Sequence, residues 1–354
     1  MDTITNKKRF FEYGFTVGFL KSGKLHSIAD VRGVTVGHAT KIEGGDVRTG
    51  VTVIDPGVEN LYQNKLPAAF YAGNGFGKAA GSIQIEELGI LETPIVLTNT
   101  LAVGRASRAM IDIVLSQGGV EKMQTINVFA GECNDGFLND IHKDSVSEQD
   151  VAKAYKDRKA DVGVGNVGAG TGTRCFSWKG GIGTASRLAR IGGKEYSVGV
   201  LVQTNYGGAL EILGVPVGKL LGKTDYENII SDADGSCMIA VATDAPLTSR
   251  QLKRLAKRAL MGLARTGTIM RTGSGDFVVA FTTSREGLEG SGNIGLCLGD
   301  ADLNGLFLAA AEATQESVYD ALFAAQTIQG RDGNMLEALP KDRVINLLSD
   351  NDKK

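Results

Sequence analysis

The sequence predicts an α+β fold in which helices cover layers of β-sheet. Short runs rich in Val, Ile and Ala, typical of buried strands, are mixed with longer amphipathic runs typical of helices. These runs do not follow the even strand–helix alternation of a doubly wound parallel sheet, so a layered arrangement is the better class. The 48 glycines among 354 residues gather in clusters, which indicates many tight turns and close approaches of the backbone.

In the first half of the chain, strand-like runs end at prolines, glycines and polar turn residues. Residues 28–38 look rich in turns. We expect the last strand of this half to deliver residues 132–140 to a loop, where polar side chains are well positioned for a site. The expected strands are 50–55, 67–73, 93–99 and 127–131, and the expected helices are 79–91, 103–116 and 147–159.

In the second half, a charged segment separates two groups of elements. Residues 218–234 carry six charged side chains without core periodicity, which predicts an exposed, mobile connector. Thr248 or Ser249 can cap the helix that follows the connector. No repeat or shift in composition divides the chain, so we expect one domain over 1–354. The expected strands are 173–178, 196–203, 237–243 and 277–283. One expected helix begins at about residue 248 and ends near 265, and a second spans 303–329.

Composition argues against several classes of function. A net charge of −2 gives no electrostatic reason to bind nucleic acid or an anionic membrane. No apolar stretch approaches the ~20 residues that a membrane span requires. The four cysteines form no Cys-x-x-Cys pair, which favours a reducing compartment, and Glu12 and Lys21 interrupt any run of signal-peptide length. We therefore predict a cytoplasmic protein.

Ser236 is a candidate nucleophile. It follows Gly235 at the mouth of the apolar run 237–243, and a serine behind a glycine can attack the preceding carbonyl with little steric obstruction. A cut there would give Ser236 a free α-amine, whose reference pKa of ~7.7–8.0 suits a base near neutral pH. From these residues alone a cap or turn serine is the favoured interpretation, because Gly-Ser pairs are common in turns.

The histidines and the glycine run 168–173 provide weaker evidence for a catalytic or binding site. His26, His38 and His142 have no Gly-x-Ser-x-Gly elbow beside them, so we interpret them as structural or solvated. The glycine run is followed by a strand-like segment rather than the helix of a dinucleotide fingerprint. We interpret its glycines as allowing a tight backbone crossing, which could also turn N–H groups toward a substrate oxyanion.

The acidic residues do not predict a metal site. Glu132, Asp135, Asp140 and Asp244 have no histidine nearby and no paired spacing, so we expect neither a metal nor another cofactor. For Glu132 we favour a different role, because a carboxylate at a strand end could hold the ammonium group of a substrate.

A series of ordered blocks runs along nearly the whole chain: 28–38, 48–52, 74–77, 93–100, 168–172, 179–184, 200–205 and 232–247. Together these blocks resemble the L-aminopeptidase/D-esterase family, the autoproteolytic serine aminopeptidases that include the β-peptidyl aminopeptidases. The resemblance implies a cut between Gly235 and Ser236, giving an α chain of residues 1–235 and a β chain of 236–354. It also implies a four-layer α/β/β/α sandwich, similar to N-terminal-nucleophile hydrolases but wound differently, and a tetramer of αβ units.

The resemblance implies a role for each matching residue. Ser236 matches the nucleophile, and Ser274 and Asp276 match the serine and acid that steer its α-amine. Asn205 matches the asparagine that polarises the scissile carbonyl. Glu132 looks like the anchor of the substrate ammonium group.

Three residues depart from the family pattern. Asp276 stands where some members have glutamate, Asn134 where some have an aromatic hydroxyl, and Lys78 where glutamate is common. Asn134 and Lys78 bear on substrate choice, so the preference among L-α, D-α and β-amino acyl groups cannot simply be inherited.

The resemblance implies a self-processing aminopeptidase or amidase that acts on small peptides, amides or esters through an acyl-enzyme on Ser236. Two alternatives stay open. An acyltransferase would use an amine in place of water, as the similar ornithine acetyltransferases do with a threonine nucleophile. An unprocessed relative would only bind ligands.

Overall fold

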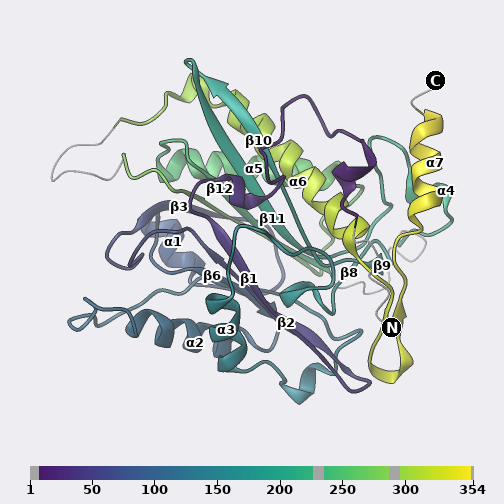
Figure 1. Cartoon of the computed structure of the whole chain (residues 1–354), viewed down its shortest axis with the longest axis horizontal. Coiled ribbons are helices and arrows are strands. Elements are labelled where there is room, and N and C mark those ends of the chain that lie inside the picture. Colours follow the sequence, from purple (N-terminus) through teal and green to yellow (C-terminus); the bar gives the residue numbers. More distant parts are fainter. Residues whose placement is uncertain (1–7, 226–234, 287–295, 352–354) are drawn as a thin grey trace.

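Two β-sheets packed face to face form the centre of the structure, a computed structural model that describes residues 8–225, 235–286 and 296–351 (Figure 1). The five-stranded sheet has the order β1 (Thr35–Glu43), β2 (Val47–Asp55), β6 (Ile95–Asn99), β7 (Ala130–Cys133) and β4 (Ala79–Ala80). The six-stranded sheet has the order β10 (Ile182–Ile191), β11 (Lys194–Asn205), β12 (Gly235–Thr243), β13 (Ser274–Thr282), β3 (Leu66–Gly75) and β5 (Ile90–Leu91).

Helices cover the outer face of each sheet. α2 (Val103–Leu115) and α3 (Glu148–Lys156) pack on the five-stranded sheet, and α5 (Ser249–Ala264) and α6 (Asn304–Ala324) pack on the six-stranded sheet (Figure 1). These four layers confirm the predicted α+β sandwich. The smaller elements are α1 (Ser82–Leu88), α4 (Val217–Leu220), α7 (Lys341–Asn351) and the short hairpins of β8 (Arg174–Cys175) with β9 (Trp178–Lys179) and β14 (Ile328–Gln329) with β15 (Met335–Leu336).

β12 is buried on both faces, which explains its unbroken apolar sequence. Met238 and Ala240 belong to the core between the sheets, whereas Cys237 and Ile239 belong to the core under the helices. Burying a side chain the size of Met238 or Ile239 contributes about 1.5–3 kcal/mol, so the strand is firmly held. Because side chains alternate along a strand, Ser236 lies on the same face as Met238 and points toward the five-stranded sheet.

Buried charges join α6 to β10 and to the N-terminal segment. Arg187 of β10, only 1% exposed, lies 3.3 Å from Glu312 and 2.6 Å from Glu316 of α6. One turn further along the helix, Asp320 pairs with Arg9 at 2.9 Å. The three acids are spaced at i, i+4 and i+8 and therefore share one face of α6.

Most expected elements are present with shifted ends, but several expectations were wrong. Residues 28–38, expected to be rich in turns, contain the start of β1, and the strand β10 at 182–191 was not predicted. The helix expected at 79–91 is divided into β4, α1 and β5, because Gly81 and Gly89 have left-handed backbones at the two ends of α1. The strand expected at 173–178 is a hairpin, and β7 includes Glu132 and Cys133 rather than leaving them to a loop.

The long C-terminal helix and the connector also differ from expectation. α6 stops at Ala324, because Ala325 is extended, instead of running on to 329. Within the connector Gly218 is buried and belongs to α4, while residues 226–234 lie outside the described part of the chain. Thr248, one of the two cap residues named above, is the one that caps α5, by accepting a hydrogen bond from the Gln251 N–H.

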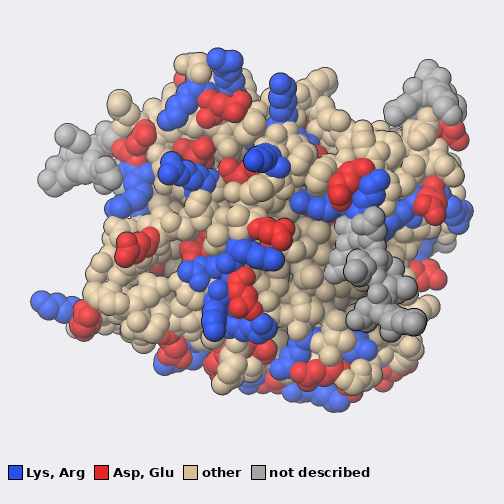
Figure 2. Space-filling view, in the orientation of Figure 1, with Lys and Arg blue, Asp and Glu red and all other residues tan. Residues whose placement is uncertain are grey.

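The surface is mixed in charge. Figure 2 shows basic and acidic side chains interspersed over one face, consistent with the net charge of −2. Within the described ranges, none of the helices has the length and apolar character needed to cross a membrane.

Candidate active site

Ser236 lies at the mouth of a small cavity where the two sheets meet. It begins the buried part of β12, paired with Asn205 of β11 on one side and with Gly275 of β13 on the other. Its residue is only 5% exposed. The cavity holds about 240 Å³ and is lined by Gly75, Phe76, Gly77, Lys78, Thr100, Glu132, Asn134, Gly235, Ser236 and Gly273.

Asn205 presents its amide N–H to the serine. Its Nδ2 lies 3.4 Å from Ser236 Oγ, while its Oδ1 accepts a hydrogen bond of 3.2 Å from the backbone N–H of Arg174. The second bond fixes which end of the amide faces the cavity. A donor held in this way can support an oxyanion formed beside Ser236.

Ser274 and Asp276 lie beside the Gly235–Ser236 peptide on the neighbouring parallel strand. A methyl group on Gly235 would stand 3.1 Å from Ser274 Oγ, which shows how closely that hydroxyl approaches the backbone. Ser274 Oγ and Asp276 Oδ2 are buried and make no hydrogen bond of normal geometry with the described residues, although the Ser274 hydroxyl lies near enough to Asp276 to lower the pKa of its carboxyl. Burial raises the pKa of the Asp276 carboxyl to about 6. Buried polar atoms are rarely left unpaired, so this pair needs an explanation.

The backbone that carries Ser274 is fixed by Asn74. The Asn74 side chain donates to the carbonyl oxygens of Arg271 and Thr272, at 2.9 and 3.1 Å, and also to that of Ser274. Gly275 has no room for a side chain, because a Cβ there would lie 2.4 Å from the carbonyl oxygen of Phe76. The block 74–77 therefore shapes the cavity and positions Ser274.

Glu132 lies in β7 on the opposite wall of the cavity and is 5% exposed. Its Oε1 accepts a bond of 3.1 Å from the Lys78 backbone N–H, and its Oε2 accepts one from the Thr100 hydroxyl. The Lys78 ammonium lies 3.6 Å from Oε1. A buried carboxylate with this support is suited to hold a cation. That Glu132 holds the ammonium group of a substrate stays a prediction.

Asn134 follows β7 and is exposed at the cavity lining. Its Oδ1 accepts a bond of 2.8 Å from the Gly136 N–H, so its carbonyl end is occupied locally. Five of the seven residues singled out from the sequence are therefore at the cavity: four line it, and Asn205 lies against it beside Ser236. The other two, Ser274 and Asp276, lie behind the cavity lining. The four lining residues are Glu132, Asn134, Gly235 and Ser236.

The glycine run 168–173 is a backbone crossing. A Cβ on Gly172 would lie 2.1 Å from the Arg48 carbonyl oxygen, and one on Gly170 would lie 2.4 Å from the Ile182 nitrogen. The backbone N–H groups of residues 168–171 are all hydrogen-bonded within the protein, so they do not face a substrate oxyanion.

Lys179 stabilises this crossing and was not predicted to matter. Its buried ammonium donates to the carbonyl oxygens of Gly170, Thr173 and Gly180 at 2.8–2.9 Å. The segment it holds leads directly into Arg174, whose N–H orients Asn205. Lys179 therefore supports the site through the backbone.

No histidine lines the cavity. His38 is in β1 rather than in a turn, its Nδ1 lies 2.9 Å from Thr52 Oγ1, and burial lowers its pKa to about 4. It is therefore neutral at pH 7 and structural. In the part of the chain that the structure describes, no cluster of His, Cys, Asp and Glu is arranged to hold a metal.

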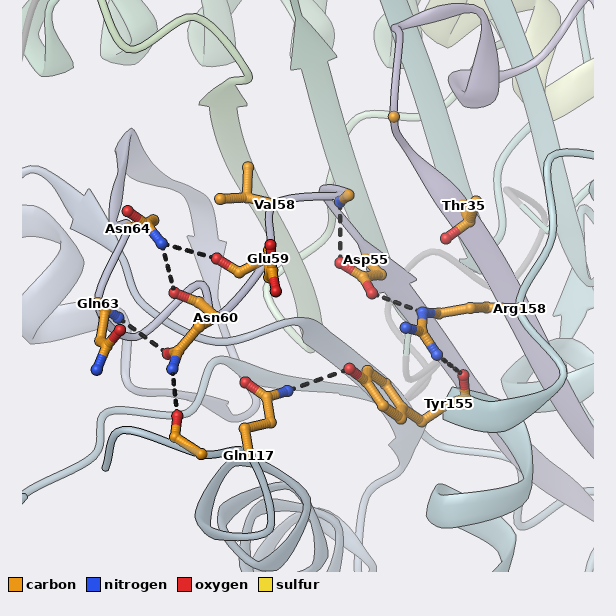
Figure 3. Close-up of a pocket in the computed structure, with 13 residues that line it drawn as sticks. Thr35, Asp55, Val58, Glu59, Asn60, Gln63, Asn64, Gln117, Tyr155 and Arg158 are labelled. Carbon is orange, nitrogen blue, oxygen red and sulfur yellow. Dashed lines mark hydrogen bonds and ion pairs between the residues drawn. The ribbon is translucent and has the colours of Figure 1, made fainter. Parts of the chain in front are cut away.

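A larger hollow of about 1050 Å³ lies elsewhere, beside Asp55 and Arg158 (Figure 3). Several of its polar groups are paired with one another: Arg158 Nε donates to Asp55 at 2.6 Å, and Gln117 to the Tyr155 hydroxyl at 3.2 Å. It contains none of the residues expected to be catalytic, so the smaller cavity is the candidate site.

Sequence reasoning missed Thr100 and the contact of Lys78 with Glu132. Thr100 follows the buried run 95–99, and a polar residue at the end of such a strand is a signal that could have been used. The pairing of Lys78 with Glu132 joins residues 54 positions apart and depends on how the sheets meet, so spacing could not reveal it.

Comparison with known proteins places these features in a family. Residues 26–336 match the family model described as Peptidase family S58. Beta-peptidyl aminopeptidase BapA of Sphingosinicella microcystinivorans is 37% identical in an alignment 347 positions long, which covers 90% of this chain and 87% of that protein.

Solved structures agree. The PH0078 protein from Pyrococcus horikoshii OT3 has a TM-score of 0.90 and 42% identity, covering 97% of this chain and 99% of that one. The L-aminopeptidase D-Ala-esterase/amidase of Ochrobactrum anthropi, described as a prototype for the serine aminopeptidases and a variant of the Ntn-hydrolase fold, has a TM-score of 0.86 and 34% identity. Here the coverage is 97% of this chain and 98% of that one.

Proposed function

Because the chain belongs to peptidase family S58 and is a hydrolase of the aminopeptidase/amidase type, we propose that its nucleophile is Ser236, freed by self-cleavage after Gly235. The observation that carries the proposal is the unpartnered pair behind the scissile peptide. Ser274 Oγ and Asp276 Oδ2 are buried, and neither makes a hydrogen bond of normal geometry with the described residues. They have only each other, since the nearby Ser274 hydroxyl lowers the pKa of the Asp276 carboxyl against the larger effect of burial. An α-ammonium group at Ser236 would bring three N–H donors to this place and satisfy both.

Self-cleavage would begin when Ser236 Oγ attacks the Gly235 carbonyl. The C–N bond of the peptide breaks, the hydroxyl proton passes to the departing nitrogen, and an ester joins Gly235 to Ser236. Water then hydrolyses the ester, leaving a carboxylate on Gly235 and a free amine on Ser236. The close approach of Ser274 to this peptide supports a role for its hydroxyl in proton transfer.

Substrate hydrolysis would reuse the same serine. The freed amine takes the proton of Ser236 Oγ, which attacks the carbonyl of the substrate's first amide. Asn205 supports the oxyanion, a contribution typically worth about 3–4 kcal/mol. The leaving amine takes the proton, and water then resolves the acyl-enzyme. Glu132 anchors the substrate ammonium, and small peptides, amides and esters fit the cavity.

The substrate class follows from the relatives. Two proteins named Beta-peptidyl aminopeptidase BapA and a Burkholderia structure named beta-aminopeptidase are each 35–37% identical to this chain. We therefore include β-amino acyl amides, such as β-alanyl p-nitroanilide, among the substrates. Names of aminopeptidases favour hydrolysis over acyl transfer and over ligand binding without catalysis.

We also propose how the protein is assembled. A cut at Gly235 divides a single domain of 1–354 into an α chain, 1–235, and a β chain, 236–354. Resemblance to the family supports a homo-oligomer, a tetramer of αβ units. Cys133, Cys175, Cys237 and Cys297 are all free thiols, which supports a cytoplasmic location.

The test is the intact mass of purified protein. We expect two fragments with the masses of 1–235 and 236–354, and hydrolysis of β-alanyl p-nitroanilide. Ser236→Ala should remain at the full-length mass and be inactive, because it has no hydroxyl to attack.

A matched control is Ser116→Ala, at the exposed end of α2, which should be cut and active like the wild type. Cleavage of Ser236→Ala at the same bond, or an uncut wild type that still hydrolyses the substrate, would contradict the proposal.

A further inference from the structure

Two opposite charges lie side by side in the cavity that contains Ser236. Lys78 Nζ is 3.6 Å from Glu132 Oε1. No other charged side chain lines this cavity among the described residues. The cavity is therefore dipolar and close to neutral, rather than simply acidic as a site for a substrate ammonium would be.

The two charges differ in mobility. Glu132 has a side chain only 5% exposed, and both its oxygens accept hydrogen bonds, from the Lys78 N–H and the Thr100 hydroxyl. The Lys78 side chain is 55% exposed and holds its ammonium by one ion pair. The carboxylate is thus fixed in place, while the lysine can turn to meet a charge on a bound molecule.

This arrangement affects which acyl group fits best. A substrate that carries only an ammonium must share Glu132 with Lys78, which already offsets much of the carboxylate's charge. A substrate that carries an ammonium and a carboxylate on one carbon offers a partner to each. Its ammonium can bind Glu132 while its carboxylate takes Lys78, so neither protein charge loses its ion pair.

We propose that this enzyme prefers β-aspartyl amides, in which aspartate is linked through its side-chain carboxyl. The inference rests on the function proposed above. A β-aspartyl group is a β-alanyl group with a carboxylate added to the carbon that bears the amine. It therefore keeps the spacing between amine and scissile carbonyl of a β-amino acyl substrate and adds the charge that Lys78 can bind.

The reaction would follow the same steps as for other amides. Ser236 Oγ forms an ester with the side-chain carbonyl of the β-aspartyl group, and the amide nitrogen leaves with a proton. Water then hydrolyses the ester, which releases free aspartate and the amine. Lys78 is a specificity residue that binds the substrate without entering these steps.

The experiment compares kcat/KM for β-aspartyl and β-alanyl p-nitroanilide, which differ only in the carboxylate. Wild type, Lys78→Met and Lys253→Met are measured after intact mass shows equal processing. Lys253→Met is the matched control, because it removes a lysine that pairs with Glu86 on the exposed surface.

We expect wild type to favour the β-aspartyl compound, and Lys78→Met to lower the β-aspartyl to β-alanyl ratio by about threefold to fivefold, the upper part of the range for a partly exposed charge pair. The loss should be in KM for the β-aspartyl compound. Lys253→Met should keep the wild-type ratio.

Two results would overturn the inference while leaving the proposed function in place. The first is good hydrolysis of β-alanyl p-nitroanilide with a ratio that Lys78→Met does not change. The second is a preference for α-aspartyl or γ-glutamyl p-nitroanilide over the β-aspartyl compound, since these move the carboxylate or lengthen the acyl group. Failure of processed wild type to cleave any of the four compounds would instead overturn the proposed function.

Discussion

At the scale of single residues, the buried Asp276 carboxyl lowers the stability of the uncut protein, which the sequence does not reveal. Its carboxyl lies behind the cavity with Oδ2 unpartnered among the described residues, and burial raises its pKa from 3.8 to about 6. A group whose pKa is raised on folding binds protons more tightly in the folded state. Its ionised form therefore destabilises the uncut protein at neutral pH, and this cost disappears below the unfolded pKa.

This gives a prediction about pH and stability. In the uncut Ser236→Ala protein, the free energy of unfolding should fall by up to about 3 kcal/mol from this group as pH rises from 4 to above 6. Adding Asp276→Asn removes the titrating group and should remove that fall. Urea unfolding of both proteins at pH 4, 5, 6 and 7 measures the difference. Parallel pH profiles for the two proteins would show that Asp276 does not titrate as described.

Single residues were the most predictable part of the site, and the reason was resemblance rather than spacing. Nothing in the numbering brings Asn205, Ser236 and Ser274 together. β11, β12 and β13 are neighbours, however, and they pair Asn205 with Ser236 and Ser274 with Gly235. Thr100 and Lys78 were missed as partners of Glu132 because their contacts are made by the stacking of strands that are distant in sequence.

At the scale of elements, the contact between β10 and α6 depends on buried charge. Arg187 is nearly inaccessible and its guanidinium binds Glu312 and Glu316. Removing one partner of a buried ion pair leaves the other charges uncompensated in a low-dielectric interior. α6, β10 and the N-terminal segment that carries Arg9 meet at these buried ion pairs. A substitution that breaks one pair should therefore destabilise the packing of all three.

We therefore expect Arg187→Met, in the Ser236→Ala background, to lower the free energy of unfolding by about 3–5 kcal/mol. Denaturant unfolding at pH 7 measures it. Arg108→Met is the control, since it breaks an exposed pair with Asp112 on α2 and should cost less than about 1 kcal/mol. Equal effects of the two substitutions would mean that the buried network does not hold β10 to α6.

Elements with regular apolar patterns were predictable, and those with buried polar residues were not. β12 and β13 contain unbroken apolar runs and α5 has the apolar spacing of a helix, and all three were expected close to where they occur. β10 contains Thr184, Ser186 and Arg187, all buried, so its sequence does not look like a core strand. The Ser186 hydroxyl and the Arg187 guanidinium bind carboxylates more than 100 positions away, which no local pattern can indicate.

At the scale of the whole molecule, the proposed α and β chains are interleaved. β12 pairs with β11 from the α chain and with β13 from the β chain, and β13 pairs in turn with β3 from the α chain. The core between the sheets also draws on both chains. The layered architecture could be expected from the sequence, but this interleaved order of strands could not, because it is set by long-range pairing.

Interleaving predicts that the cut protein stays together. On native size-exclusion chromatography the fragments 1–235 and 236–354 should co-elute, and they should separate only in denaturant. Mass spectrometry of the eluted fractions identifies them. Separate elution at neutral pH without denaturant would show that the shared sheet does not hold the two chains.

The position of Ser236 in the middle of a shared sheet has a consequence for the lifetime of the protein. Asn205, Ser274 and Asp276 come together with Ser236 only after the sheet has formed. A cut at Gly235 would therefore occur only in chains that have folded correctly. Unfolding would then release two polypeptides, and recovery would need an encounter between them. Refolding of the mature protein would become second order and dependent on concentration, whereas the precursor folds as one chain.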